Sequence, residues 1–216
     1  MGHFLEGLVR FPHHKGGTLR ASGHFRLPHP RQIYKDKDGK LWVSAFDVES
    51  FIIDIRNYIV QKYPLPDLRN QLKANPAINS LCKDEDGIFW FSQDRYGLCI
   101  YDSRKKKLKH YSQCQGIRNL PFGDVTNIAR SYSHNRIWAT SYGSTVFGLS
   151  QLNMEMKEDV RIELGNVTKN PGQVTSLFED LQNNLWIGTT TGLFVYRIMS
   201  ATLESIPEVS GPVAGI

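Results

Sequence analysis

Short apolar segments alternate with polar turns along the whole chain, at a spacing that suits strands and not helices. Each segment is five to seven residues long, and turn signals recur every 8 to 12 residues, which is typical of all-β sandwiches, barrels and propellers. The segments fall into four sets of four. The expected first strands are RQIYK (31–35), INSLCK (78–83), VTNIAR (125–130) and VTSLFE (174–179).

The remaining segments of each set follow in a fixed order. A second strand carries a tryptophan, a third is strongly apolar and a fourth is weaker. The third strands are expected at SFIIDI (50–55), GLCIYD (97–102), STVFGLS (144–150) and GLFVYR (192–197), and the fourth at YIVQKY (58–63), LKHYS (108–112), VRIEL (160–164) and TLESIP (202–207).

The four tryptophans of the chain, Trp42, Trp90, Trp138 and Trp186, are each 48 residues apart. A fixed period of this length indicates stacked supersecondary units, one per repeat. Four short strands in 48 residues correspond to one blade of a β-propeller. Tryptophan at regular spacing is expected to form the core between blades, where a large ring buries the most area.

The turn before each tryptophan strand supports this interpretation. Asp36, Asp84 and Asp180 each lie six residues before a tryptophan, and Gly or Asn lies three residues before all four. Asp starts a turn by accepting hydrogen bonds from the backbone ahead of it, and Gly and Asn tolerate the left-handed conformation that closes a hairpin. The third repeat departs from the pattern, because it lacks the Asp and carries one extra residue.

The sequence therefore predicts an all-β chain that forms part of a propeller of four-stranded antiparallel blades, with about 4.5 blades present. Residues 7–11 resemble a third strand and residues around 24–27 a fourth, so the chain is expected to open inside a blade. The expected blade boundaries are 1–28 (the outer two strands of a blade), 29–76, 77–124, 125–172, 173–211 and 212–216 (the start of a next blade).

Composition narrows the function classes. The 216 residues carry a net charge of +5 and 11% aromatic residues, which indicates a folded chain with a sizeable core. No apolar run approaches transmembrane length, and residues 1–20 lack the apolar segment of a signal peptide. The basic run at 104–109 is interpreted as a solvated outer hairpin, so neither nucleic acid nor a membrane surface is expected as a partner of this segment.

Known catalytic and metal-binding patterns are absent from the sequence. The three cysteines and seven histidines form no zinc signature, and neither a nucleophile elbow nor a phosphate-binding loop is present. Cys82 and Cys99 are expected on first and third strands of one blade, too far apart for a disulfide. No metal, cofactor or catalytic residue is predicted.

The repeats resemble one known family. Residues 174–197, VTSLFEDLQNNLWIGTTTGLFVYR, and residues 78–102, INSLCKDEDGIFWFSQDRYGLCIYD, are similar to the two-component regulator propeller repeat. The resemblance implies the periplasmic sensor propeller of a Bacteroidetes-type hybrid histidine kinase, often linked to carbohydrate sensing. It also implies a non-catalytic recognition module outside the cytoplasm, although no export signal is present in this sequence.

Any ligand is expected on the face formed by the loops that join second to third strands and one blade to the next, because rigid scaffolds carry recognition on such loops. Aromatic rings there would stack on a sugar, and Arg95 or Arg118 could bind a uronate or sulfate in bidentate fashion. The candidate ligand-binding residues are Phe46, Asp47, Glu49, Asp94, Arg95, Tyr96, Arg118 and Tyr142.

Two other functions remain open from the sequence. The first is a scaffold that binds a protein partner, the remaining propeller blades or another copy of itself through open strand edges. The second is a propeller lyase or glycosidase using Asp47, Glu49 and Asp94, which ranks last because nothing more specific accompanies these carboxylates.

Overall fold

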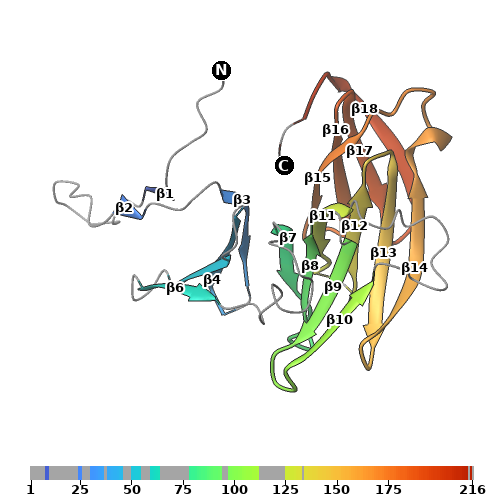
Figure 1. Ribbon diagram of the computed structural model, residues 1–216. Helices are drawn as coiled ribbons and strands as arrows, with labels where there is room; N and C mark the ends of the chain where they lie inside the picture. Colours follow the sequence, from blue (N-terminus) through green and yellow to red (C-terminus); the bar gives the residue numbers. More distant parts are fainter. Residues whose placement is uncertain are drawn as a thin grey trace. The chain divides into compact units, whose positions relative to one another are not determined.

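The computed structural model is all-β, apart from one short 3₁₀ helix (Figure 1). It describes residues 8–9, 24–25, 30–36, 38–45, 50–54, 59–63, 78–93, 97–111, 125–132, 134–213 and 215. Four antiparallel sheets of four strands and one two-stranded hairpin make up this part of the chain. Among the described residues, no helix is long or apolar enough to span a membrane. The chain divides into two compact units, Met1–Ile78 and Asn79–Ile216.

The first unit holds the hairpin and one sheet. In the hairpin, β1 (Leu8–Val9) pairs with β2 (His24–Phe25). The sheet runs in the order β3-β4-β5-β6. Its strands are β3 (Pro30–Lys35), β4 (Lys40–Ala45), β5 (Ser50–Asp54) and β6 (Ile59–Tyr63).

The second unit holds three sheets, each a meander of four consecutive strands. The first is β7 (Ile78–Lys83), β8 (Phe89–Gln93), β9 (Gly97–Asp102) and β10 (Lys107–Tyr111). The second is β11 (Val125–Arg130), β12 (Ile137–Ser141), β13 (Thr145–Leu152) and β14 (Glu155–Glu163), followed by the 3₁₀ helix η1 (Leu164–Asn166). The third is β15 (Val174–Glu179), β16 (Asn184–Thr189), β17 (Gly192–Arg197) and β18 (Thr202–Ser210).

The four-stranded antiparallel blades predicted from the 48-residue repeat are confirmed. Five of the predicted first and third strands agree with the structure to the residue, since the turn residues and apolar runs mark their ends. In the sheet β11–β14, the fourth strand is longer than expected and begins at Glu155, because the pairing of β13 with β14 extends as far as Leu152 and Glu155.

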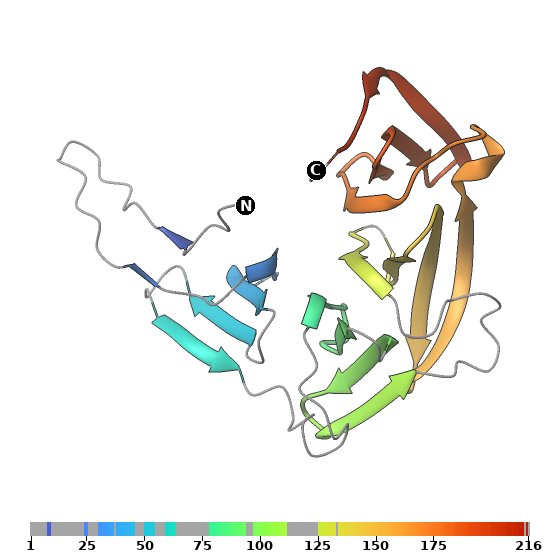
Figure 2. The ribbon, with the colours of Figure 1, turned by 45° about the horizontal axis from the view of Figure 1, so that its top comes forward.

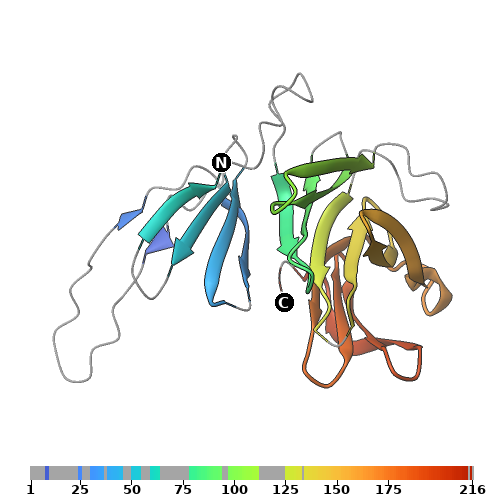
Figure 3. The ribbon, with the colours of Figure 1, turned by 90° about the horizontal axis from the view of Figure 1, so that it is seen from below.

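Neighbouring blades of the second unit pack face to face around an apolar core. Trp138 and Val146 of one sheet pack with Leu185, Ile187 and Phe194 of the next, all nearly or fully buried. The ring of Tyr196 meets Trp138 edge-on, with ring centroids 6.3 Å apart. Figures 2 and 3 show the three sheets of this unit standing side by side.

Hydrogen bonds between blades repeat with the sequence period. The Ser80 hydroxyl donates to the carbonyl of Ile128 at 3.1 Å and accepts from its N–H at 3.0 Å, and the two residues are 48 apart. The Asn127 amide donates to the carbonyl of Thr175 at 3.1 Å, again 48 residues on. A polar side chain in the first strand of one blade thus binds the backbone of the first strand in the following blade.

Three of the tryptophans are held by the Asp of their own hairpin. The indole Nε1–H of Trp42, Trp90 and Trp186 donates to Oδ2 of the Asp six residues earlier, at 2.8 Å in each case. The other Asp oxygen accepts backbone N–H groups of the turn, for example that of Ile88 onto Asp84 at 2.8 Å. The Asp therefore closes the hairpin and satisfies a buried donor at once.

The third tryptophan uses a different acceptor. Ser131 stands where the other hairpins have Asp, and the Trp138 indole donates instead to Glu179 Oε2 at 2.6 Å. Glu179 belongs to the next blade, and its Oε1 also accepts the Ser131 hydroxyl and the Tyr132 N–H, both at 3.0 Å. A carboxylate from the following blade thus replaces the missing Asp.

Burial of the tryptophans is uneven. Trp42, Trp90 and Trp138 are buried, whereas Trp186 is half-buried. Trp138 is covered by the blade that follows it, and no blade follows the sheet of Trp186 among the described residues. Cys82 and Cys99 are buried, as predicted from their strand positions, and no disulfide joins them.

Candidate functional site

The loop between β12 and β13 presents the exposed aromatic that the sequence analysis predicted. Tyr142 leaves this loop with 67% of its side chain exposed. The loop is held at the two residues that follow the tyrosine, because the Val174 N–H donates to the Gly143 carbonyl at 2.8 Å and the Leu164 N–H donates to the Ser144 carbonyl at 3.1 Å. Tyr142 is therefore carried on a well-anchored backbone.

The connection from η1 to β15 forms the second wall of the site. It is bound to the β16–β17 loop of the next blade, since the Gln173 N–H donates to the Thr190 hydroxyl at 3.0 Å and the Thr190 N–H returns a bond to the Gln173 carbonyl at 2.9 Å. The Thr191 hydroxyl donates to the Asn170 carbonyl at 3.2 Å. These bonds hold the connection between two blades.

Gly172 allows this connection to pass close to the threonines. Its φ is +71°, in the left-handed region, and a Cβ there would lie 2.5 Å from Thr190 Oγ1 and 2.8 Å from Thr191 Oγ1. Only glycine meets both requirements without displacing its neighbours.

An open depression of about 450 Å³ lies between these two walls. It is lined by Tyr142, Gly143, Ser144, Asn170, Pro171, Gly172 and Gln173. The lining combines one aromatic ring with amide and hydroxyl groups, and the described residues that form it carry no charged side chain. Such a surface can stack on an apolar face and exchange hydrogen bonds with neutral polar groups.

The groups with shifted pKa values lie elsewhere, in the hairpins, on the outer strands and in the core. Burial raises the pKa of Asp84, against the hydrogen bonds from Trp90 and Ile88. Burial also favours the protonated form of Asp180, but hydrogen bonds from Asn184, Trp186 and the turn backbone outweigh it and hold its pKa at about 2. Burial raises the pKa of the Cys82 and Cys99 thiols.

Shifted pKa values can mark catalytic groups. Here each shifted carboxylate of a tryptophan hairpin binds an indole N–H and closes a turn, which explains the shift by the fold alone. Among the described residues, no group of three or more His, Cys, Asp or Glu side chains is placed to hold a metal ion.

Of the candidate residues predicted from sequence, the structure describes Tyr142 alone. The other candidates, Phe46, Asp47, Glu49, Asp94, Arg95, Tyr96 and Arg118, lie outside the described residues. Sequence reasoning named the connections between blades as part of the recognition face, but it did not single out Asn170 and Gln173. The signal was the Pro171-Gly172 pair, a turn dipeptide that the repeat does not require.

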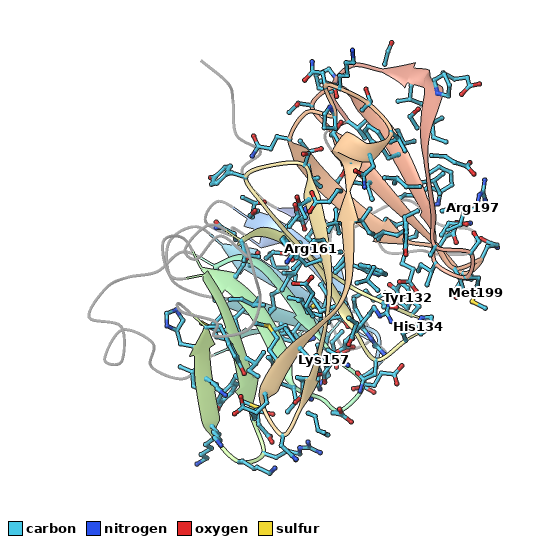
Figure 4. The ribbon with its side chains drawn as sticks, turned by 90° about the vertical axis from the view of Figure 1, so that its right-hand side faces the viewer. Tyr132, His134, Lys157, Arg161, Arg197 and Met199 are labelled. Carbon is cyan, nitrogen blue, oxygen red and sulfur yellow. The ribbon has the colours of Figure 1, made fainter. Side chains whose placement is uncertain are left out.

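The hairpin at the other end of β12 carries a second exposed tyrosine. Tyr132 is 52% exposed and lies, with His134, in the turn between β11 and β12 (Figure 4). Tyr142 follows β12 and Tyr132 precedes it, so the two exposed rings lie at opposite ends of the same sheet.

Comparisons with known proteins find relatives among sensor proteins. No family model matches the chain. Histidine kinase P4 of Formosa agariphila is 24% identical over 221 residues, which covers 81% of this chain and 16% of that protein. The chain thus spans less than a fifth of the length of this curated relative.

Solved structures show the fold. The extracellular domain of a hybrid two-component system from B. thetaiotaomicron superposes with a TM-score of 0.63 at 20% identity, over 90% of this chain and 27% of that one. The β-propeller domain of Myceliophteria thermophila Cps50 (Swd1) gives 0.66 at 12% identity, over 91% and 65%. The β-propeller fold and the similarity to two-component sensor proteins, both predicted from the repeat, are confirmed.

Proposed function

We propose that this chain is a non-catalytic, ligand-sensing propeller segment of a two-component sensor of the hybrid histidine kinase type. The support is the joint similarity to a histidine kinase and to an extracellular domain of a hybrid two-component system. The same similarity supports a location outside the cytoplasm, in the periplasm. A kinase domain and signalling partners in the full protein are also part of this proposal, because the chain spans only a small share of the length of these relatives.

The proposed ligand is a neutral carbohydrate, bound in the depression beside Tyr142. The observation that carries this is the uncharged, hydrogen-bonding lining of the depression, which has an exposed aromatic ring at its edge. A sugar ring has an apolar C–H face that suits the tyrosine and hydroxyl groups that suit the Asn170 and Gln173 amides. The volume of about 450 Å³ falls within the range of small-molecule sites.

The same lining favours binding over glycoside hydrolysis. Glycosidases use two carboxylates that flank the scissile bond. Among the described residues that line the depression, none carries a carboxylate, and the phenol of Tyr142 is the single titratable side chain. Recognition without turnover is the function that these groups support.

The test is a screen of neutral oligosaccharides by glycan array, followed by calorimetry on the best ligand. Tyr142→Ala is expected to weaken binding by about 5-fold, because an aromatic contact in a partly desolvated site is worth about 1 kcal/mol. Tyr132→Ala is the matched control, since it removes another exposed tyrosine from the other end of the sheet.

Two results would overturn the proposal. One is the failure of the folded chain to bind any sugar on the array. The other is a bound sugar whose affinity falls equally with Tyr142→Ala and Tyr132→Ala, because the depression would then not be its site.

A further inference from the structure

The loop between β16 and β17, residues 189–191, consists of three threonines and is hydrogen-bonded to two segments that are far apart in the sequence. This threonine loop is closed internally by the Thr189 hydroxyl. The hydroxyl donates to the Gly192 carbonyl at 2.9 Å, and it accepts the N–H groups of Gly192 at 3.1 Å and Thr191 at 3.2 Å. A loop closed in this way is stiff, so displacing one of its residues displaces the others.

On one side, the threonine loop holds the wall of the depression that faces Tyr142. The Gln173 N–H donates to the Thr190 hydroxyl at 3.0 Å, and the Thr190 N–H donates to the Gln173 carbonyl at 2.9 Å. The Thr191 hydroxyl donates to the Asn170 carbonyl at 3.2 Å. Thr190 and Thr191 therefore fix the backbone of the two residues whose amides line the depression.

On its other side, the loop holds residues 211–213, which follow β18. The Gly211 N–H donates to the Thr191 carbonyl at 3.1 Å, and the Val213 N–H donates to the Thr189 carbonyl at 2.9 Å. These bonds use loop carbonyls, whereas the bonds to the wall use two hydroxyls and one N–H. The wall and segment 211–213 thus bind the same loop without competing for its atoms.

We propose that segment 211–213 and the wall of the depression are coupled through the threonine loop, so that the segment sets the affinity of the depression for its ligand. Opening of the segment takes the donors from two loop carbonyls, and the loop that shifts in response no longer holds Asn170 and Gln173 in place. Thr190 and Thr191 are positioning residues in this proposal. Coupling is reciprocal, so a ligand that fixes the wall also stabilises segment 211–213. The control of affinity rests on the proposed ligand site, whereas the coupling itself does not.

The coupling is tested on the chain without any sugar, by hydrogen exchange of single amides followed by NMR. Gly211→Ala perturbs the segment alone, because the φ of +99° strains an alanine while its Cβ meets nothing within 4 Å. We expect exchange of the Thr190 amide, which binds the wall, to rise by at least about 5-fold, the lower end of ordinary coupling factors. Exchange in β12 of the neighbouring sheet is expected to stay unchanged, which separates coupling from general destabilisation. Gly215→Ala is the matched control, because its Cβ also meets nothing within 4 Å and its φ lies outside the left-handed region.

The reverse perturbation acts on the wall side alone. Thr190→Val removes the hydroxyl that accepts the Gln173 N–H and leaves intact the loop carbonyls that bind segment 211–213. It is expected to speed exchange of the Gly211 and Val213 amides by a similar factor, because coupling acts equally in both directions. Thr190→Ser keeps the hydroxyl and is expected to restore exchange to the wild-type rate.

The affinity arm uses the neutral oligosaccharide that binds best on the glycan array, titrated by calorimetry. Gly211→Ala is expected to raise its Kd by at least about 5-fold, and Gly215→Ala to leave it unchanged. The coupling is overturned if Gly211→Ala leaves the Thr190 amide at its wild-type rate, if it speeds β12 as much, or if Thr190→Val leaves Gly211 and Val213 unaffected. A sugar that binds wild type and Gly211→Ala equally would overturn the control of affinity. If exchange is coupled but no sugar binds, the proposed ligand fails and the coupling stands.

Discussion

Replacing Glu179 with alanine tests how the third tryptophan hairpin is held. The carboxylate, 1% exposed, accepts hydrogen bonds from the Trp138 indole, the Ser131 hydroxyl and the Tyr132 N–H. The substitution removes all three acceptor contacts. It also removes these hydrogen bonds between the two blades, at the hairpin end of their interface.

The expected cost follows from the burial of the donors. Trp138 and Ser131 are both 0% exposed, so water does not replace the lost acceptor. A buried donor left unsatisfied costs about 1–3 kcal/mol. The Tyr132 N–H is in a more open hairpin and adds little. We therefore expect Glu179→Ala to lower the free energy of unfolding by about 3 kcal/mol.

The assay is urea denaturation followed by circular dichroism and tryptophan fluorescence. A second substitution makes the test specific: Ser131→Asp restores the residue that the other hairpins use. In the wild-type background the new carboxylate faces Glu179 and is expected to destabilise the fold. In the Glu179→Ala background it is expected to recover part of the loss, because it can accept the Trp138 indole.

The reasoning would be refuted by a loss smaller than about 1 kcal/mol for Glu179→Ala, which is the least that one unsatisfied buried donor should cost. It would equally be refuted if Ser131→Asp were as harmful in the Glu179→Ala background as in the wild type. Glu208→Ala, at an exposed position of β18, serves as a control for the loss of a carboxylate as such.

Three further predictions follow from single positions. The pKa of Asp180 is held at about 2, below its unfolded value of about 3.9, so its contribution to stability is present above pH 4 and is lost as pH falls toward 2. Urea titrations of Asp180→Asn should therefore show a free energy of unfolding that depends less on pH over this range, and an unchanged pH profile would contradict the prediction. Cys82 and Cys99 are buried, and their thiol pKa values are raised. In a Cys114→Ser variant, which retains only these two cysteines, a thiol reagent should react only after denaturant is added. Fast labelling of the native variant would contradict their burial. Gly172→Ala combines a positive φ with a 2.5 Å contact to Thr190, so it should lower the free energy of unfolding by about 1–3 kcal/mol. The control Gly165→Ala, where a Cβ meets nothing within 4 Å, should lower it by less than about 1 kcal/mol, and equal losses for the two variants would contradict the close approach.

Much of the fold could be predicted because the residues that close each hairpin recur at fixed positions in the repeat. An Asp six residues before a tryptophan fixes both the hairpin and the indole bond, as at Asp84 and Trp90, so strand order and turns follow from spacing. The third hairpin shows where this reasoning stops. Its missing Asp was visible in the sequence, but the replacement, Glu179, lies 41 residues beyond Trp138 and becomes apparent only when the blades are packed.

The candidate site was predictable in location and not in detail. Tyr142 could be named because it follows a repeated strand at a fixed distance. Asn170 and Gln173 could not, since the connection between blades varies in length and its shape depends on bonds to Thr190 and Thr191 of the next blade. Loop conformation set by tertiary contacts has no local sequence pattern from which it can be read.

The shared carboxylate of Glu179 also bears on how such a chain can be rearranged. A blade that closes its own hairpin, like that of Asp84 and Trp90, carries the acceptor of its tryptophan indole within its own repeat. The blade of Trp138 does not, because its hairpin is completed by a residue encoded in the following repeat. A boundary drawn between these two repeats separates a buried donor from its acceptor, so an engineered transfer of the Trp138 blade has to carry the following repeat with it.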